Sequence, residues 1–305
     1  MSERPLVVVL GPTASGKTDL AVAIARRVGG EIVSADAFAV YRGFDVGTAK
    51  PAAEIRREIP HHLIDVASPL ESFTAGRWAD AARDAIRDIE NRGRIPIVAG
   101  GSHFYVRALL SGLPGREVAC PALRRHFAGA WEPGVRRSRK RMLDILDPAY
   151  GARVPAGDTA RISRALEIIF FTGQRVSERI RSGPAPERRR VLKLALQISR
   201  QAIYTRVEAR VNAMWQSGWA REVESLRDAG VTLAAPAFRA IGYREIAGAA
   251  DGESTLEEAL RRTIARTRAL AKRQSTWLAS EPGLERLEFE AGVERAAAFI
   301  RGESA

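Results

Sequence analysis

Hydrophobic and polar positions follow two alternating patterns over the first hundred residues. Leu6–Leu10 is a short apolar run rich in β-branched residues, which is typical of a strand buried on both faces of a parallel sheet. Further strands are predicted over Glu31–Asp36 and Ile95–Ala99, and helices over Thr18–Val28 and Phe73–Arg92. This order of elements predicts an α/β protein whose parallel sheet is covered by helices.

The alternation stops at a turn-rich break, Gly112–Gly115, and helical patterns without a buried strand then continue to Arg190. The later predicted elements are, in chain order, a strand over Val191–Ile198, helical spacing from Ile203 to Leu226, a helix over Thr255–Ala279 and a strand over Leu284–Phe289. We therefore expect a core formed by residues 1–115 and 191–305, interrupted by a helical insertion over residues 116–190.

Composition and charge indicate what kind of molecule the protein binds. The 305 residues are 46% hydrophobic and carry a net charge of +12, which suits a globular protein and argues against general disorder. The segment 116–190 holds 17 basic and 8 acidic residues, so most of the excess positive charge lies in the predicted insertion. This concentration favours a polyanionic partner such as RNA, and a merely solvated basic face is the alternative.

Cysteine content and hydropathy favour an intracellular protein. Cys120 is the single cysteine and cannot form an internal disulfide, which fits a reducing compartment. No apolar run approaches the roughly 20 residues of a membrane span. Leu6–Leu10 is too short for the core of a secretory signal. We therefore expect a cytoplasmic protein that does not span a membrane.

A phosphate-binding motif follows the first predicted strand and opens the first predicted helix. Its residues fit G-x-x-x-x-G-K-[ST] at every fixed position: Gly11, Pro12, Thr13, Ala14, Ser15, Gly16, Lys17 and Thr18. The glycines allow consecutive N–H groups to point at one anion, and the helix N-terminus adds favourable dipole charge. Lys17 can reach phosphate oxygens, and the Thr18 hydroxyl can bind Mg²⁺. The motif indicates a diphosphate or triphosphate ligand, whose reaction it leaves open.

Two polar residues follow other predicted strands. Asp36 ends the second strand, where the carboxyl ends of a parallel sheet meet the ligand, and is a candidate general base. A cap of a helix or turn is the alternative role for Asp36. The third strand runs into Gly100-Gly101-Ser102 without a carboxylate, which disfavours a mechanical ATPase. Ser102 could contact a phosphate or leaving group, or it could belong to a structural turn.

At this point the chain resembles the tRNA dimethylallyltransferases, also called tRNA isopentenyltransferases. The phosphate motif is only one of the matching segments, which span almost the whole chain. The others are Ser34–Asp36 with Val40–Pro51, His61–Asp65, Gly100–Tyr105, Arg161–Glu167, Ile241–Arg244 and Ala271–Trp277. The resemblance implies a P-loop NTPase-like core with a tRNA-binding helical insertion. We expect a monomer, although the sequence does not fix the oligomeric state.

The resemblance also implies a reaction. Dimethylallyl diphosphate would donate its prenyl group to N6 of the adenosine just 3′ of the anticodon, in tRNAs that read codons beginning with U. The residues from Gly11 to Thr18 would hold the diphosphate with Mg²⁺, and Asp36 would accept the N6 proton. Ser102 stands where the family usually has Thr, and would contact substrate near the reacting centre.

The resemblance places tRNA contacts in three regions of the chain and at Ser102. Because a stacked base cannot reach a deep crevice, the target adenosine must be extruded from the anticodon loop. The implied contacts are Asp36, Ala37, Phe38 and Ala39 in the first region, Arg124, Arg161, Ile162, Ser163 and Arg164 in the insertion, and Arg239, Gly242, Tyr243 and Arg244 near the C-terminus. In this chain, Ala37-Phe38-Ala39 replaces a stretch often written Ser-Met/Leu-Gln.

Two other functions would use the same phosphate motif. A small-molecule kinase could also place Asp36 near a substrate hydroxyl, but it would require ATP turnover and would not explain the basic insertion. A nucleotide-gated RNA-binding module would bind RNA without modifying it. The requirement for ATP and the effect of replacing Asp36 distinguish these functions from prenyl transfer.

Overall fold

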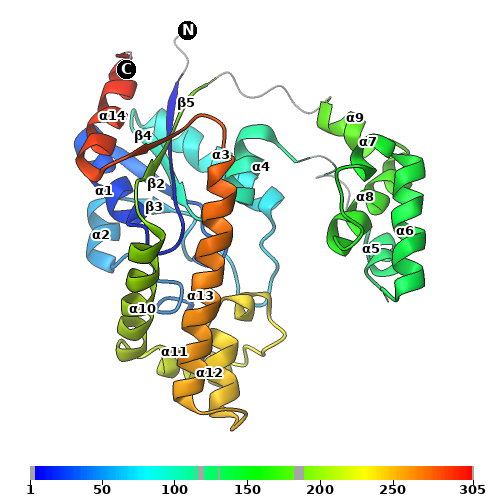
Figure 1. Cartoon of the computed structure of the whole chain (residues 1–305). Coiled ribbons are helices and arrows are strands. Elements are labelled where there is room, and N and C mark those ends of the chain that lie inside the picture. Colours follow the sequence, from blue (N-terminus) through cyan, green and yellow to red (C-terminus); the bar gives the residue numbers. More distant parts are fainter. Residues whose placement is uncertain (1–3, 114, 116–119, 130, 182–188, 304–305) are drawn as a thin grey trace. The chain divides into compact units, whose positions relative to one another are not determined.

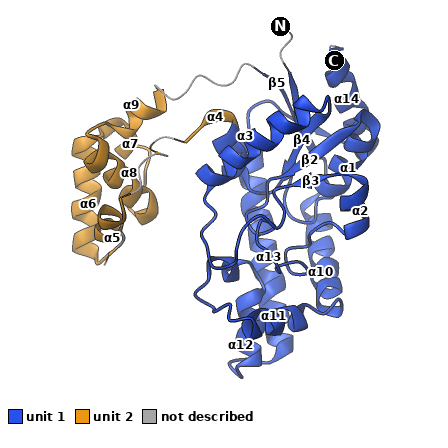
Figure 2. Cartoon of the chain, turned by 180° about the vertical axis from the view of Figure 1, so that it is seen from behind, with its two compact units in different colours: residues 1–109, 188–305 blue, residues 110–187 orange. Residues whose placement is uncertain are grey.

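The computed structural model in Figure 1 describes residues 4–113, 115, 120–129, 131–181 and 189–303. The chain divides into two compact units (Figure 2). Unit 1 comprises residues 1–109 and 188–305, and unit 2 comprises residues 110–187. Unit 2 overlaps the predicted insertion over residues 116–190, but it begins six residues earlier and ends three residues earlier.

Unit 1 is built on a six-stranded sheet in the order β3-β2-β4-β1-β5-β6, and every neighbouring pair is parallel. The strands are β1 Pro5–Leu10, β2 Gly30–Ser34, β3 His61–His62, β4 Ile95–Gly100, β5 Arg190–Leu196 and β6 Leu284–Leu287. Val7 of the central strand lies opposite Ile97 on one side and Leu192 on the other. The predicted α/β class with a parallel sheet is therefore confirmed.

Helices cover both faces of this sheet because its central strands are apolar on both faces. The helices of unit 1 are α1 Lys17–Val28, α2 Ala53–Glu58, α3 Ala75–Asn91, α4 His103–Ser111 except for its last two residues, α10 Arg200–Gln216, α11 Trp219–Asp228, η1 Pro236–Arg239, α12 Tyr243–Ala250, α13 Leu256–Ala279 and α14 Phe289–Arg301. On one face Leu20 and Ile24 of α1 and Phe299 of α14 share a core with the strands. Elsewhere in the unit Trp78 of α3 is fully buried and donates from Nε1 to the carbonyl of Ser34 at 2.9 Å.

A separate layer of helices lies beyond the carboxyl ends of the strands. Figure 1 shows α10, α11 and α12 at the end of the sheet opposite the two chain termini, where α13 also begins before it runs back alongside the sheet. The carboxyl edge of a parallel sheet is where α/β proteins bind their ligands. These helices therefore stand over the edge at which Asp36 and the phosphate motif emerge.

Two predicted elements differ from the structure. The apolar stripe from Ile203 to Leu226 is split between α10 and α11, because Gly218 at the junction adopts a left-handed conformation with φ of 90°. The predicted strand over Leu284–Phe289 ends at Leu287, and Phe289 opens α14 instead. Because β6 is an edge strand of four residues, its pattern carries little information about where it ends.

Unit 2 is helical over its described residues. Its helices are α5 Pro121–Ala128, α6 Pro133–Leu146, α7 Pro148–Gly151, α8 Thr159–Thr172 and α9 Val176–Arg181. Phe127, Leu143, Ile162 and Leu166 form its buried core. In the portion of the chain that the structure describes, no helix combines the length and the apolar character that crossing a membrane requires.

Candidate active site

The phosphate motif forms a loop between β1 and α1. Gly16 takes a left-handed conformation with φ of 87°, so the chain turns sharply into the helix at Lys17. Thr13, Lys17 and Thr18 line a cavity of about 480 Å³ in front of the loop. Ala14, Ser15 and Gly16 line a neighbouring cavity of about 660 Å³, which Lys17 and Thr18 also border. Gly11 and Pro12 line neither cavity, and the Pro12 carbonyl accepts a hydrogen bond from Lys17 Nζ at 3.3 Å.

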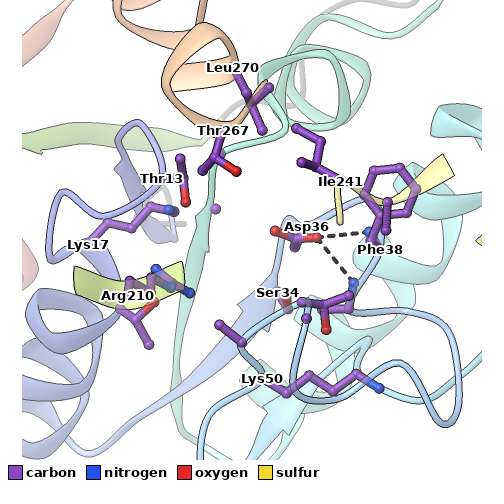
Figure 3. Close-up of a pocket in the computed structure, with 18 of the residues that line it drawn as sticks. Thr13, Lys17, Ser34, Asp36, Phe38, Lys50, Arg210, Ile241, Thr267 and Leu270 are labelled. Atoms are coloured by element: carbon purple, nitrogen blue, oxygen red, sulfur yellow. Dashed lines mark hydrogen bonds between the residues drawn. The ribbon is translucent and has the colours of Figure 1, made fainter. Parts of the chain in front are cut away.

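Asp36 caps a turn, as one of its two predicted roles requires, and it also lines the 480 Å³ cavity. Its Oδ1 accepts the backbone N–H groups of Phe38 at 2.8 Å and Ala39 at 3.1 Å. Figure 3 shows the carboxylate pointing into the cavity, between Lys17 and Thr13 on one side and Phe38 and Ile241 on the other. The turn therefore fixes one oxygen, and the cavity is open to the other.

Ser102 does not line this cavity, although the resemblance implies that it contacts substrate. Its Oγ accepts the backbone N–H of Ala37 at 3.0 Å, and its own N–H donates to the carbonyl of Ala35 at 3.1 Å. A Cβ atom on Gly100 would lie 2.1 Å from that same carbonyl oxygen, so only glycine allows the two strand ends to approach this closely. The structural turn is thus what the contacts of Ser102 support, and this turn holds the backbone on either side of Asp36.

The cavity carries a strongly positive lining. Besides Lys17, four arginine residues on α10, η1 and α13 line it: Arg210, Arg239, Arg266 and Arg273. Burial and the nearby Arg210 charge lower the pKa of Lys17 from 10.5 to about 8, although the Asp36 charge opposes this shift. Burial also lowers the pKa of Arg210. An anion bound here would relieve the mutual repulsion of these cations.

The pKa of Lys17 predicts a pH dependence of anion binding. Because the value is lowered to about 8, Lys17 carries its charge at pH 7 and loses most of it by pH 9. Relative to a Lys17→Arg variant, whose guanidinium does not titrate, wild-type affinity for inorganic diphosphate should fall by up to about tenfold over this range. Calorimetric titrations of both proteins check this, since the ratio cancels ionisation of the ligand. A constant ratio would contradict the prediction.

Gln274 joins the phosphate loop to the loop after β4, a role that its position in the sequence does not predict. Its Oε1 accepts the backbone N–H of Thr13 at 2.9 Å, and its Nε2 donates to the carbonyl of Gly101 at 2.9 Å. Gln274 lies on α13 within the matching segment Ala271–Trp277, so the resemblance marked the region but not the contact. Sequence spacing carries no signal for a hydrogen bond between residues 261 positions apart.

Of the four C-terminal residues predicted to contact tRNA, one reaches the cavity. Arg239 lines it together with Ala240 and Ile241. Tyr243 is fully buried, and its hydroxyl donates to Glu222 Oε1 at 2.6 Å, so a contact between its side chain and tRNA is not supported. Gly242 is buried against the Trp219 ring. Arg244 is exposed, lies outside the cavity lining, and donates to the carbonyl of Leu233.

The predicted tRNA residues of unit 2 divide into surface and core. Arg161 is exposed and pairs with Asp158 at 3.3 Å. Arg124 and Arg164 both pair with the buried carboxylate of Glu167, at 3.3 and 2.6 Å. The side chain of Ile162 is fully buried in the core of the unit, which corrects its predicted contact with tRNA. Ser163 Oγ donates to the carbonyl of Phe127, so its hydroxyl links two helices.

The donor set around the motif fits a magnesium ion bound mainly through its ligand. Within the described ranges, no three His, Cys, Asp or Glu side chains come together to hold a metal. Thr18 is exposed and borders both cavities, so its hydroxyl can supply one oxygen. Because Mg²⁺ retains waters and binds phosphate oxygens readily, the Thr18 hydroxyl would add one protein oxygen to an ion held largely by its diphosphate ligand.

The fold and the site together define a P-loop α/β protein with a cationic cavity into which the Asp36 carboxylate points. The family model described as IPP transferase matches residues 39–281 of this sequence. The chain belongs to the IPP transferase family, and the predicted kinship with the tRNA dimethylallyltransferases is confirmed.

Individual relatives match over nearly the whole chain. The tRNA dimethylallyltransferase 1 of Citrifermentans bemidjiense is 44% identical over 93% of this chain and 92% of its own length. The crystal structure of a tRNA isopentenylpyrophosphate transferase from Bacillus halodurans is 32% identical, with a TM-score of 0.72 over 98% of this chain and 96% of that one. A eukaryotic dimethylallyltransferase, captured in crystals acting on tRNA, is 25% identical, with a TM-score of 0.85 over 99% of this chain and 80% of that one.

Proposed function

We propose that this protein transfers the dimethylallyl group of dimethylallyl diphosphate to N6 of the adenosine 3′ to the anticodon, in tRNAs that read codons beginning with U. The observation that carries the proposal is one cavity in which the Asp36 carboxylate lies between a phosphate loop and a wall containing Phe38 and Ile241. Relatives named tRNA dimethylallyltransferase support the same reaction.

The phosphate loop is the proposed binding site for the diphosphate. Lys17, Arg210 and the N-terminus of α1 would neutralise the charge that grows on the leaving group as its bond to the allylic carbon breaks. Thr18 would hold Mg²⁺, which supplies further neutralisation of the diphosphate. On α10, the apolar side chains of Val211 and Met214 line the same cavity and offer an apolar surface to the prenyl tail.

Asp36 is the proposed general base. The exocyclic amine of adenine is a weak nucleophile, so removal of its proton during attack assists the reaction. As N6 bonds to the allylic carbon, the bond from that carbon to the diphosphate oxygen breaks, and a carboxylate oxygen of Asp36 takes the N6 proton. The hydrogen bonds from Phe38 and Ala39 to Oδ1 hold the carboxylate in place for this transfer.

The tRNA itself would be held by unit 2 and by the rim of the cavity. We propose that the exposed cations of unit 2, Arg161 among them, bind phosphates of the anticodon stem. We further propose that the protein acts as a monomer, in the cytoplasm with its tRNA substrates.

Arg161 provides a test of the phosphate contacts. Arg161→Gln should weaken binding of an anticodon stem-loop and reduce the slope of log Kd against log salt concentration by about one unit. The matched control is Arg87→Gln on α3, because Arg161 and Arg87 have equally exposed side chains and each pairs with an aspartate three residues earlier. Titrations at several salt concentrations measure both slopes. An unchanged slope for Arg161→Gln would remove this residue from the phosphate contacts.

The whole proposal is tested by weighing nucleosides. Unmodified anticodon stem-loop RNA is incubated with the protein, Mg²⁺ and dimethylallyl diphosphate, then digested and analysed by mass spectrometry. One adenosine heavier by a single dimethylallyl group, formed without ATP, is the expected result. RNA binding without any mass change would favour the RNA-binding module, and ATP consumption with a small-molecule acceptor would favour the kinase.

A further inference from the structure

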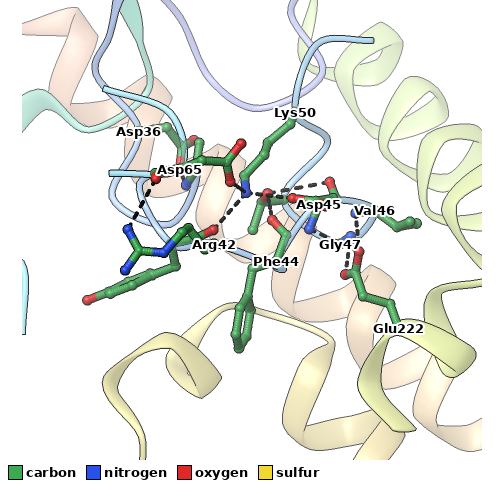
Figure 4. Close-up of polar contacts among 12 residues, drawn as sticks. Asp36, Arg42, Phe44, Asp45, Val46, Gly47, Lys50, Asp65 and Glu222 are labelled. Carbon is green, nitrogen blue, oxygen red and sulfur yellow. Dashed lines mark hydrogen bonds and ion pairs between the residues drawn. The ribbon is translucent and has the colours of Figure 1, made fainter. Parts of the chain in front are cut away.

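The carboxylate of Glu222 on α11 accepts hydrogen bonds from three consecutive backbone N–H groups in a distant loop (Figure 4). Its Oε2 accepts from Asp45 at 2.9 Å and Val46 at 2.7 Å, and its Oε1 accepts from Gly47 at 3.4 Å. Successive N–H groups that converge in this way form an anion-binding concavity. Here the chain fills that concavity with its own carboxylate, 175 to 177 positions away in the sequence.

The same carboxylate also holds α12. The hydroxyl of Tyr243, the first residue of α12, donates to Glu222 Oε1 at 2.6 Å. Hydrogen bonds to a charged acceptor are stronger than those between neutral groups, and burial of the Tyr243 ring excludes competing water. One side chain therefore joins two segments that are distant from each other in the sequence.

Packing around Glu222 keeps the two segments close together. The Trp219 ring lies on the backbone of both Gly47 and Gly242, where a Cβ atom would come within 2.1 Å of ring atoms. The ring centroids of Phe44 and Tyr243 are 4.6 Å apart. On the loop's other side, the buried Lys50 ammonium pairs with Asp45 and Asp65 and donates to the Tyr41 carbonyl. The loop is thus held from both sides.

The loop that Glu222 holds lines the proposed active-site cavity, and so do residues just before α12, although α12 itself does not. Gly47 and Lys50 come from the loop, and Arg239 and Ile241 immediately precede the helix that Tyr243 opens. In Figure 3, Ile241 and Phe38 lie across Asp36 from Lys17 and Thr13 of the phosphate loop. The part of the wall that Tyr243 anchors is therefore on the side away from the diphosphate.

We propose that Glu222 is a positioning residue that sets the geometry of the end of the cavity that receives the RNA base. This inference rests on the proposed function, because it takes the end away from the phosphate loop as the acceptor end. Glu222 does not line the cavity and acts only through the loop at 45–47 and through Tyr243. Loss of its carboxylate would release Arg239 and Ile241 from their fixed positions, whereas the phosphate loop would keep its tie to Gln274.

The test compares four variants for stem-loop KM, dimethylallyl diphosphate KM, kcat and melting temperature. Glu222→Ala removes both connections, and Tyr243→Phe removes only the one to α12. Glu222→Gln retains an oxygen for two N–H groups, and its amide can donate to the Tyr243 oxygen, so it should restore most of the function. Glu224→Ala is the matched control, since Glu224 is an exposed glutamate on the same helix.

Glu222→Ala should raise the stem-loop KM by about tenfold or more and change the donor KM by less than about twofold. Tyr243→Phe should raise the stem-loop KM by about threefold, and it decides the question if Glu222→Ala does not fold. Equal changes in both KM values, or values like those of Glu224→Ala, would overturn the positioning role while the proposed reaction stands. Absence of prenylation by the wild-type protein would overturn the proposed function and this inference together.

Discussion

Asp36→Asn is expected to lower kcat by about 10²- to 10⁴-fold, the usual contribution of a positioned general base. The asparagine oxygen can still accept the N–H groups of Phe38 and Ala39, so the turn that Asp36 caps should survive. Only the capacity to take a proton is lost. Affinity for the stem-loop should therefore stay within about threefold of wild type, because the proton transfer belongs to the transition state. Single-turnover kinetics with excess protein, together with a binding titration, measure the two effects separately.

The control for this substitution is Asp84→Asn, which changes an exposed aspartate of α3 that pairs with Arg87. It should leave kcat and affinity unchanged. A large loss of RNA affinity in Asp36→Asn with normal kcat would assign Asp36 to binding and would contradict its role as base.

Lys17→Ala should lower kcat/KM for dimethylallyl diphosphate by about 10²- to 10³-fold, comparable to the loss of one strong donor to a developing negative charge. Lys17 lines the cavity beside Thr13 and Thr18, and its ammonium donates to the Pro12 carbonyl at 3.3 Å. Both kcat and the donor KM should change, because the charge on the diphosphate is present in the ground state and grows in the transition state. Steady-state kinetics with varied donor concentration measure both constants.

Lys272→Ala is the comparison for Lys17→Ala, because Lys272 is an exposed lysine of α13 that lies outside the cavity lining. Its donor KM should match that of the wild-type protein. Lys17→Arg should recover part of the activity, since the charge remains. Normal donor kinetics in Lys17→Ala would show that the diphosphate binds elsewhere and would contradict the assignment of the phosphate loop.

The phosphate loop and the strands around it could be predicted from the sequence, because their structure depends on residues that are neighbours along the chain. A buried strand, a glycine-rich turn and a helix start occupy adjacent positions from Pro5 to Val28, and their geometry is set by local backbone preferences. Asp36 comes directly after a predicted strand. Because parallel strands present their carboxyl ends to the ligand, its location at the ligand-binding edge of the sheet could also be predicted.

The contacts of individual site residues could be predicted less well from the sequence. Ser102 and Tyr243 belong to matching segments, yet both form hydrogen bonds to the protein outside the cavity lining. Ile162 lies between two predicted tRNA contacts in the sequence, but the helical periodicity of α8 turns its side chain into the core. Proximity to a motif in sequence thus identifies a region, and burial decides what each side chain there can reach.

Sequence by itself determined the α/β class, the phosphate loop, the basic character of the segment 116–190 and the family, because each of these is encoded in local pattern, composition or matching motifs. Only the tertiary structure decided that Asp36, Arg210, Arg239 and Gln274 meet around one cavity, and that Glu222 fills a concavity of backbone N–H groups. These contacts join residues far apart along the chain. Their partners are chosen by the packing of α10 to α13 over the sheet edge, for which periodicity along one segment holds no information.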